Sequence, residues 1–225
     1  MTSAANDAQA PMHFPDPDPG RASGDPASPA SPAAALHWQR CFVALTPVRA
    51  TAERLALASG PGIRAVHPAN LHLTLAFIGD LPAELGQEVA RTLPSLARPL
   101  RCLPLEAIEW WPDSIRPRVL VATFTANDEL LALVDHLRTR LAQAGLPTGN
   151  AFRAHLTLAR ASRRITAEAA ASAARHADPP THACFTALTL YATRPDGPAG
   201  QYWQAASIPL GEVLAGPDGV ARHIP

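Results

Sequence analysis

The sequence lacks the long apolar runs and the cysteine pattern that would place it in several large protein classes. No apolar run approaches the length of a membrane-spanning helix, and the N-terminus has no apolar segment typical of a secretory signal. Its three cysteines, Cys41, Cys102 and Cys184, are widely spaced, and no CxxC or Cys/His spacing indicates a zinc site. We expect Cys41 and Cys184 to be small core residues, and we expect a reducing, cytoplasmic location.

The chain also lacks an excess of charge of either sign. Its 19 Lys and Arg residues balance its 19 Asp and Glu residues, unlike the strongly basic composition of proteins that coat duplex nucleic acid. If the substrate is a nucleic acid, this balance favours binding at a terminus over binding along the length. No GxGxxG, P-loop or GxSxG motif occurs, so nothing supports a nucleotide-binding fold or a serine hydrolase.

The two ends of the chain differ in composition from its middle. Residues 1–36 hold seven of the 24 prolines, and Ala, Ser, Asp and Gly fill most of the rest. Because such a segment cannot form a helix or a central strand, we predict a disordered leader. Residues 211–225 are predicted to be an irregular tail. Apolar residues make up 47% of the chain, which suffices for a core, and we assign one domain to residues 37–210.

Predicted strands and helices alternate through this domain. Strands are expected at 41–45, 71–79, 103–110, 118–124, 153–159, 184–191 and 201–208, and helices at 46–60, 82–96, 127–145 and 166–176. The order strand, helix, strand, helix, strand appears roughly twice, which indicates an internal duplication. The predicted fold class is α+β, with two pseudo-symmetric lobes, each an antiparallel sheet with outer helices, facing across a central cleft.

The tetrapeptide His-Leu-Thr-Leu occurs twice, at His72–Leu75 and at His155–Leu158. Each copy alternates polar and apolar residues, as a half-buried strand does. Because successive strand side chains point to opposite faces, the His and the Thr of each copy share one face. One copy alone is equally consistent with a strand whose polar face meets water. The repetition of the whole tetrapeptide predicts a site that uses both histidines.

Two histidines on facing strands suit acid–base chemistry at phosphorus. Imidazole titrates near neutrality, so His72 and His155 can carry different protonation states at one pH, one accepting and one donating a proton. In-line displacement needs the attacking and leaving oxygens on opposite sides of the phosphorus, which two lobes can provide. Thr74 and Thr157 project on the same faces and can donate hydroxyl hydrogen bonds to phosphate oxygens.

An arginine near the second motif can add a positive charge. Arg153 shares the face of His155 and Thr157, and we predict it as a phosphate ligand, the alternative being a solvated charge at the rim. Arg160 has the opposite parity and reaches that face only if the strand ends or bulges before it. No carboxylate lies within two residues of either motif histidine, which argues against a carboxylate-rich metal site.

We therefore predict no metal and no cofactor. Four aromatic residues can in principle stack on a nucleobase, although packing is the simpler role for each of them: Trp110, Trp111, Tyr202 and Trp203.

With their flanks, the two motifs resemble the two-histidine (2H) phosphoesterase superfamily. The branch they resemble is the RNA 2′,3′-cyclic phosphodiesterases, historically called 2′-5′ RNA ligases. The similar segments are 40–45, 70–79, 116–120, 152–160 and 188–191. The chain departs from the family at Ala154, where relatives often have a proline before the second histidine, and its backbone is therefore less restrained there.

The resemblance implies a bilobal fold with a central cleft and metal-independent opening of a terminal 2′,3′-cyclic phosphate to a 2′-phosphomonoester. It implies that His72 donates a proton to the leaving 3′ oxygen and that His155 accepts a proton from water. Thr74 and Thr157 match the threonines that hold the phosphate. The implied partners are RNA 3′ ends, or nucleotides that carry a 2′,3′-cyclic phosphate.

Three alternatives stay open on the sequence. The same groups can catalyse the reverse reaction, 2′-5′ joining of RNA ends, because acid and base exchange roles in reverse. The chain can instead be a non-catalytic module that binds nucleotide or RNA phosphate ends. It can also be a 2H enzyme that acts on another small cyclic phosphodiester. We expect a monomer, with no membrane contact and no stable protein partner.

Overall fold

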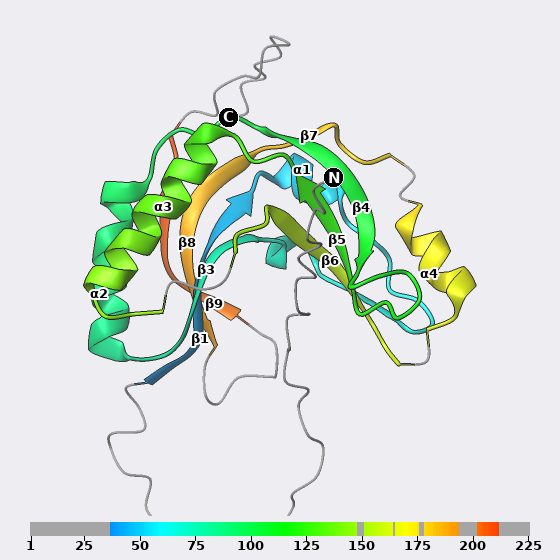
Figure 1. Ribbon diagram of the computed structural model, residues 1–225, viewed down its shortest axis with the longest axis horizontal. Coiled ribbons are helices and arrows are strands. Elements are labelled where there is room, and N and C mark those ends of the chain that lie inside the picture. The colour runs from blue at the N-terminus through cyan, green and yellow to red at the C-terminus, as the bar shows by residue number, and fades with distance from the viewer. Residues whose placement is uncertain (1–36, 148–150, 164, 176–177, 194–201, 212–225) are drawn as a thin grey trace, which may run out of the picture.

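The structure is a computed structural model that describes residues 37–147, 151–163, 165–175, 178–193 and 202–211 (Figure 1). The predicted leader and nearly all of the predicted tail lie outside these residues. The strands are β1 (His37–Pro47), β2 (Ile63–Ala65), β3 (Leu73–Pro82), β4 (Leu103–Trp111), β5 (Val119–Phe124), β6 (His155–Ala161), β7 (His182–Ala183), β8 (Phe185–Thr193) and β9 (Tyr202–Pro209). The helices are α1 (Arg49–Arg54), α2 (Ala83–Leu96), α3 (Asp128–Gln143) and α4 (Ala167–Ala174), with a 3₁₀ turn at Pro68–Asn70.

The strands form two antiparallel groups that meet at one point. Their order is β7-β4-β5-β6-β3-β1-β8-β9, and β2 adds to β6 beside β3. The first lobe contains β1, β3, β8 and β9, and the second contains β2 and β4 to β7. Between the lobes, β3 and β6 pair only at Leu73 and Leu156. The predicted α+β fold with two lobes is confirmed, and the strands of the two lobes join in one continuous order.

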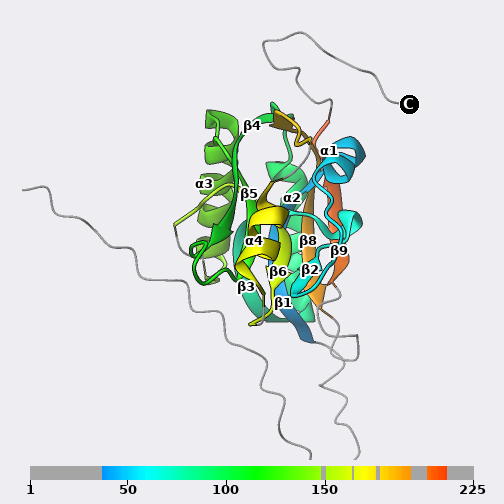
Figure 2. The same cartoon turned by 90° about the vertical axis from the view of Figure 1, so that its right-hand side faces the viewer.

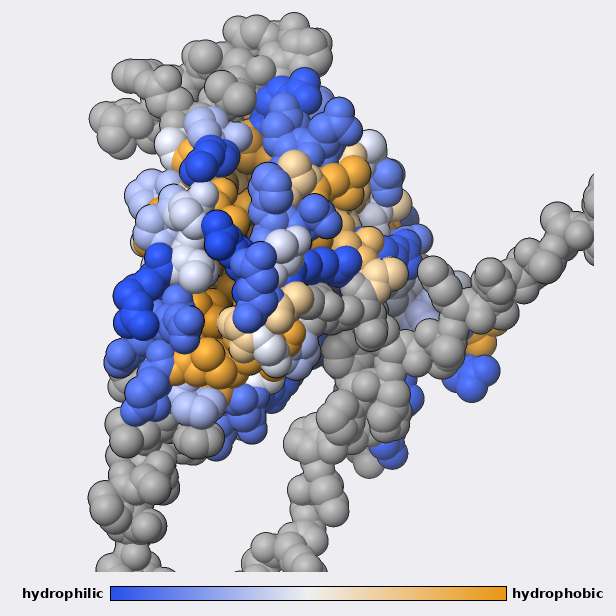
Figure 3. Space-filling model, turned by 60° about the vertical axis from the view of Figure 1, so that its left-hand side comes forward, coloured by the Kyte–Doolittle hydropathy of each residue, from blue (hydrophilic) through white to orange (hydrophobic). Residues whose placement is uncertain are grey.

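Helices α2 and α3 lie together on one side of the curved sheet, and α4 lies near its other end (Figure 1). The apolar residues predicted for α2 bury Val89, Leu93 and Leu96 against the sheet. Gly86 is required where α2 crosses β1, because a Cβ atom at this position would overlap the indole of Trp38. The outward surface of this side is mainly hydrophilic, with apolar side chains between the polar ones (Figure 3).

Helix α3 begins and ends as its sequence predicts. The Asn127 side chain accepts a hydrogen bond from the Leu130 backbone N–H at 2.9 Å, which satisfies one free donor of the first turn. Gly145 adopts a positive φ of 70° just beyond the helix, the conformation that favours glycine at a helix end. These two residues fix the length of α3, and its apolar face packs into the main core beneath the sheet.

Helix α4 covers a second, smaller core. Thr166 caps it by accepting a hydrogen bond from the Ala169 N–H at 3.1 Å. Trp110 of β4 is buried beneath it and donates its indole N–H to the Ala170 carbonyl at 2.8 Å. Seen from this side, α4 lies in front of β6 and close to β5 (Figure 2). Trp110 is thus a core residue, the simpler of the roles considered for it.

The first helix is shorter than predicted and begins later. Thr46 and Pro47 remain in β1 because both pair with β8, Thr46 opposite Ala187 and Pro47 opposite Phe185. Thr46 also hydrogen-bonds through its hydroxyl to those of Thr189 and Tyr191, each at 3.0 Å. Long-range pairing therefore overrides the local helix-start signal of Thr46-Pro47, and α1 spans only Arg49–Arg54.

The prediction for Cys184 was wrong, whereas Cys41 is buried and free as expected. Cys184 forms a disulfide with Cys102, across a sequence separation of 82 residues. Cys102 precedes β4 of the second lobe and Cys184 precedes β8 of the first, so the bond ties the two lobes together. The sequence could not reveal this pairing because the two cysteines approach each other only in the folded chain. None of the described helices is long and apolar enough to cross a membrane.

Candidate active site

The two His-Leu-Thr-Leu motifs lie on either side of the point where the lobes join. Leu73 pairs with Leu156, and both side chains are fully buried. Because side chains alternate along a strand, the His and Thr that flank each leucine point to the opposite face of the sheet. Extending the antiparallel register by one residue places His72 across from Thr157, and Thr74 across from His155. We call the face that carries these four residues the motif face.

Both histidines are held by the same hydrogen bond. His72 Nδ1 donates to the Asn70 carbonyl at 2.7 Å, and His155 Nδ1 donates to the Arg153 carbonyl at 2.8 Å. Because a carbonyl oxygen only accepts, the proton of each neutral imidazole resides on Nδ1. Nε2 is then the atom left to take or give a proton. The sequence predicted the two histidines, and the structure adds this matched orientation.

The protonation of both histidines is shifted in the same direction. Burial lowers the pKa of His72 below its ordinary value of 6.5, the hydrogen bond to the Asn70 carbonyl opposes this, and the charges of His155 and Arg160 lower it further. Burial also lowers the pKa of His155, against the hydrogen bond to the Arg153 carbonyl, and the Arg153 charge adds to the lowering. The neutral form of each imidazole is therefore favoured near neutral pH.

Aromatic rings of the first lobe surround His72. Its ring centroid lies 4.8 Å from that of Phe42, 5.6 Å from Tyr191 and 5.8 Å from Tyr202. Phe42 stacks on Tyr191 at 5.1 Å, and Phe77 lies 5.5 Å from Phe42 with 55% of its surface exposed. These rings supply the burial that lowers the His72 pKa. Of them, only Tyr202 was singled out in the sequence, because the others are far apart along the chain.

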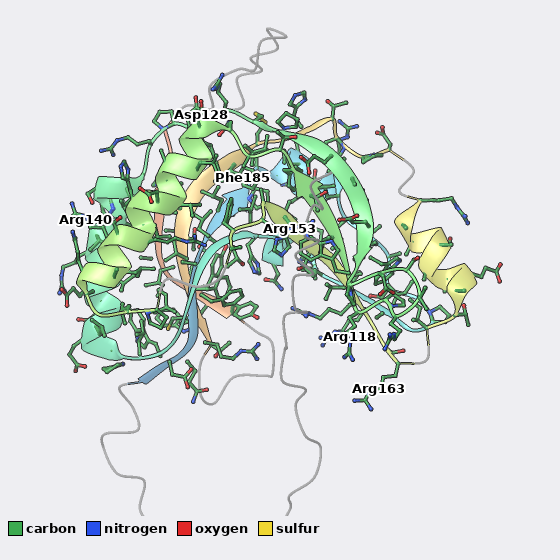
Figure 4. All side chains as sticks on the ribbon, viewed as in Figure 1. Arg118, Asp128, Arg140, Arg153, Arg163 and Phe185 are labelled. Carbon is green, nitrogen blue, oxygen red and sulfur yellow. A yellow bond between two sulfur atoms is a disulfide. The ribbon has the colours of Figure 1, made fainter. Side chains whose placement is uncertain are left out.

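His155 has different neighbours, with an indole and charged groups. The Trp111 ring lies 4.7 Å from the His155 ring, and the Arg153 guanidinium lies 4.3 Å from the centroid of Trp111. Glu109 accepts a hydrogen bond from the Trp111 indole N–H at 2.8 Å and lies 3.8 Å from Arg153. Arg153 is on the inner side of the arch of strands (Figure 4). Its charge is thus near His155, but it is stacked on Trp111 and paired with Glu109.

Arg160 reaches the motif face through a β-bulge in β6. Leu120 of β5 pairs with Ala159 but the next residue, Val121, pairs with Thr157, so Leu158 is an extra residue in β6. Arg160 pairs with Val119, two residues from Val121, and therefore shares the face of Thr157. The parity that disfavoured Arg160 in the sequence is reversed by this bulge. Its influence on the pKa of His72 places its charge near the first motif as well.

The threonines complete the motif face. Thr74 and Thr157 are half-buried. Among the residues that the structure describes, neither hydroxyl has a hydrogen-bond partner, so both are free to bind a ligand oxygen. Within the same residues, no group of three or more His, Cys, Asp or Glu side chains is placed to hold a metal ion.

Several known proteins resemble this chain in sequence or in fold. A family model described as "LigT like Phosphoesterase" matches residues 45–121. Over 108 residues, the chain is 29% identical to the RNA 2′,3′-cyclic phosphodiesterase of Archaeoglobus fulgidus, covering 48% of this chain and 61% of that one. The crystal structure of E. coli LigT complexed with 3′-AMP aligns with a TM-score of 0.58 and 26% identity, over 78% of this chain and 99% of LigT.

The chain thus resembles the LigT-like phosphoesterases, in sequence over residues 45–121 and in fold over most of the described domain. The protein TT0787 of Thermus thermophilus shares the fold, with a TM-score of 0.56 and 24% identity, over 76% of this chain and 97% of that one. The sequence match spans less than two thirds of the A. fulgidus enzyme, whereas the structural match spans nearly all of LigT. The two-lobe architecture is thus shared with LigT over 78% of this chain.

Proposed function

We propose that this protein hydrolyses terminal 2′,3′-cyclic phosphates of RNA to 2′-phosphomonoesters, with His72 and His155 as the catalytic pair. The observation that carries the proposal is the matched pair of imidazoles, each fixed through Nδ1 to a backbone carbonyl, on one face at the joint of two lobes. A binding module needs no such pair of proton-handling groups. The name of the A. fulgidus relative and the 3′-AMP bound to LigT support a nucleotide phosphate as the substrate class.

The mechanism assigns a proton transfer to each Nε2. His155 accepts a proton from water as the water oxygen bonds to phosphorus. His72 in its protonated form, which is the minor form near neutral pH, donates a proton as the bond from phosphorus to the 3′ oxygen breaks. The atoms balance: water supplies one oxygen and two hydrogens, and the product carries a 2′-phosphate and a 3′-hydroxyl. The assignment of acid and base follows the family resemblance, because the two hydrogen-bonding patterns are alike.

The remaining groups of the motif face stabilise the phosphate. Thr74 and Thr157 donate their free hydroxyls to non-bridging oxygens, where negative charge develops in the transition state. Arg160 adds a positive charge on the same face and is, in this proposal, a stronger phosphate ligand than Arg153. Arg153 instead acts on His155 from its position over Trp111. The reverse joining of 2′-5′ ends would use the same groups in exchanged roles.

The test is a hydrolysis assay with a short RNA that ends in a 2′,3′-cyclic phosphate, run with EDTA present. We expect the wild type to form a 2′-phosphate, and His72→Ala and His155→Ala each to lose turnover. His136→Ala is the matched control, because His136 is an exposed histidine on α3, away from the motif face. Full turnover in both motif variants would refute the proposal. RNA-end binding without any turnover by the wild type would support a binding module instead.

The same assay can distinguish another substrate. A wild type that opens a small cyclic phosphodiester but no RNA end would indicate another substrate within the superfamily. The cytoplasmic location and the monomeric state predicted from the sequence stay predictions, which fractionation of cells and light scattering can check.

A further inference from the structure

Two arginines lie directly across from each other next to the proposed reaction centre. Strand β2 pairs with β6 so that Arg64 is opposite Arg160. Directly opposed residues of an antiparallel pair point to the same face, with Cβ atoms about 5 Å apart. Because Arg160 lies on the motif face, Arg64 lies there too. Both side chains are exposed.

This pair is unfavourable in the absence of an anion. Like charges directly opposite each other on a sheet repel. Across the part of the chain that the structure describes, neither guanidinium has a carboxylate partner or a side-chain hydrogen bond. Three other exposed arginines do have such partners: Arg49 binds Glu53, Arg54 binds Asp178 and Arg101 binds Glu129. Two unpaired guanidiniums side by side, each with several donors, match the oxygens of a phosphate.

The position of the pair indicates which phosphate it meets. Arg160 follows Thr157 in β6 by three residues, which along a strand is about 10 Å or less between Cα atoms. Arg160 is the nearer of the two arginines to the reaction centre, since its charge lowers the His72 pKa. Arg64 lies further along the edge of β6 that β3 uses, opposite Arg160, and its charge is not among those that lower the His72 pKa. A group bound by Arg64 is therefore adjacent to the reacting phosphate and distinct from it.

We propose that Arg64, together with Arg160, forms a second anion subsite that binds the phosphate on the 5′ side of the terminal nucleoside. This inference rests on the proposed function, and it makes the preferred substrate one with two phosphates. In RNA that second phosphate is the phosphodiester to the preceding nucleotide. In a mononucleotide it is a 5′-phosphate, which offers the same oxygens.

The experiment compares three substrates: a nucleoside 2′,3′-cyclic phosphate, the same nucleoside with an added 5′-phosphate, and a dinucleotide with a terminal 2′,3′-cyclic phosphate. For Arg64→Gln, we expect kcat/KM to fall about tenfold or more for the dinucleotide relative to the simple cyclic nucleotide, as for the loss of a charge-assisted hydrogen bond. Arg91→Gln, which removes an exposed arginine from α2, is the matched control and should leave the substrate ratio unchanged. An equal fall for the 5′-phosphorylated nucleotide would assign the subsite to any 5′-phosphate, and no fall there would assign it to the phosphodiester.

Other outcomes separate this proposal from the function itself. If the wild type turns over all three substrates and Arg64→Gln keeps their ratios, the subsite is refuted while the function stands. An equal loss on all three would place Arg64 at the reacting phosphate and also overturn the subsite. If the wild type turns over none of them, the function fails, and calorimetric binding of a dinucleotide 2′-phosphate decides the subsite, with unchanged affinity in Arg64→Gln refuting it. The unfolding temperature of Arg64→Gln should be unchanged or higher, because the variant relieves a like-charge pair.

Discussion

The two copies of His-Leu-Thr-Leu are identical in sequence, but their surroundings are different. The imidazole of His72 packs among Phe42, Tyr191 and Tyr202, whereas that of His155 lies beside Trp111, on which Arg153 is stacked. Their hydrogen bonds are the same, so the contrast isolates the effect of the neighbours. Repetition of the motif supplies two imidazoles that are held in the same way, and the neighbouring residues give each imidazole a different environment. Unequal neighbours are what an acid and a base in one reaction require.

The largest effect that separates the two copies is expected from their removal. His72→Ala and His155→Ala should each lower kcat by about 10²–10⁴-fold, because each histidine handles one proton in the transition state. Combining them should cost little more than either alone, since the pair acts as a unit. Single-turnover assays with the cyclic phosphate check this. A diester with a good leaving group, such as 4-nitrophenol, should restore turnover in His72→Ala but not in His155→Ala. Restoration in the opposite variant would reverse the assignment of acid and base.

Breaking the bond between the lobes should have the next largest effect. Reduction of Cys102–Cys184, or Cys102→Ser, should lower the free energy of unfolding by about 2–4 kcal/mol, because the bond closes a long loop in the unfolded chain. Urea denaturation with and without reductant measures the change. Cys41→Ser is not a suitable control, because Cys41 is buried in the core and its replacement would change stability by itself. Unchanged unfolding after verified reduction would show that the lobes are held by packing alone.

The pH dependence of stability should follow from the lowered pKa values. Both histidines titrate below 6.5 in the folded protein and near 6.5 when unfolded, so the unfolded chain binds more protons between these values. Their contribution to the free energy of unfolding is therefore present above 6.5 and is lost as the pH falls towards the folded values. Urea denaturation at about pH 7.5 and about pH 5.5 should show a smaller decrease for His72→Ala than for the wild type. An equal decrease would contradict the lowered pKa of His72.

The smallest effect, and the one that distinguishes the copies most finely, concerns the pH–rate profile. The kcat/KM profile should be a bell centred below pH 6.5, with limbs that belong to the coupled pair. Removing the nearby charge with Arg153→Gln should move one limb to higher pH, because Arg153 lowers the His155 pKa. Arg160→Gln should move the other limb to higher pH, because the Arg160 charge lowers the His72 pKa. If both limbs of the profile stay at the same pH in both variants, neither arginine charge affects the histidine pKa values.

Local patterns predicted much of the fold because they report on short-range interactions. The amphipathic spacing in α2, the Asn127 cap and the Gly145 end of α3 all depend on residues within one or two turns. Prediction failed where a distant strand was involved. Thr46 and Pro47 look like a helix start but pair with β8, which the sequence places about 140 residues later.

The candidate site shows the same division. Period-two alternation placed His and Thr of each motif on one face, and the register of β3 with β6 is consistent with that expectation. The same alternation ranked Arg153 above Arg160, and the bulge at Leu158 reverses the parity on which that ranking depended. A bulge is defined by what the partner strand does, so β6 alone could not reveal it. The aromatic rings around His72 come from three separate strands and were equally hidden, apart from Tyr202.

The sequence by itself determined that the chain carries two equivalent His-Thr faces on strands, within a repeated arrangement of helices and strands. Alternation and helical periodicity are properties of the backbone, so they can be read from neighbouring residues. Only the tertiary structure decided that the motifs meet at Leu73 and Leu156, that Cys102 pairs with Cys184, and that Arg64 faces Arg160. These contacts join residues that are distant in the chain, and their geometry is set by strand register and packing of the whole fold.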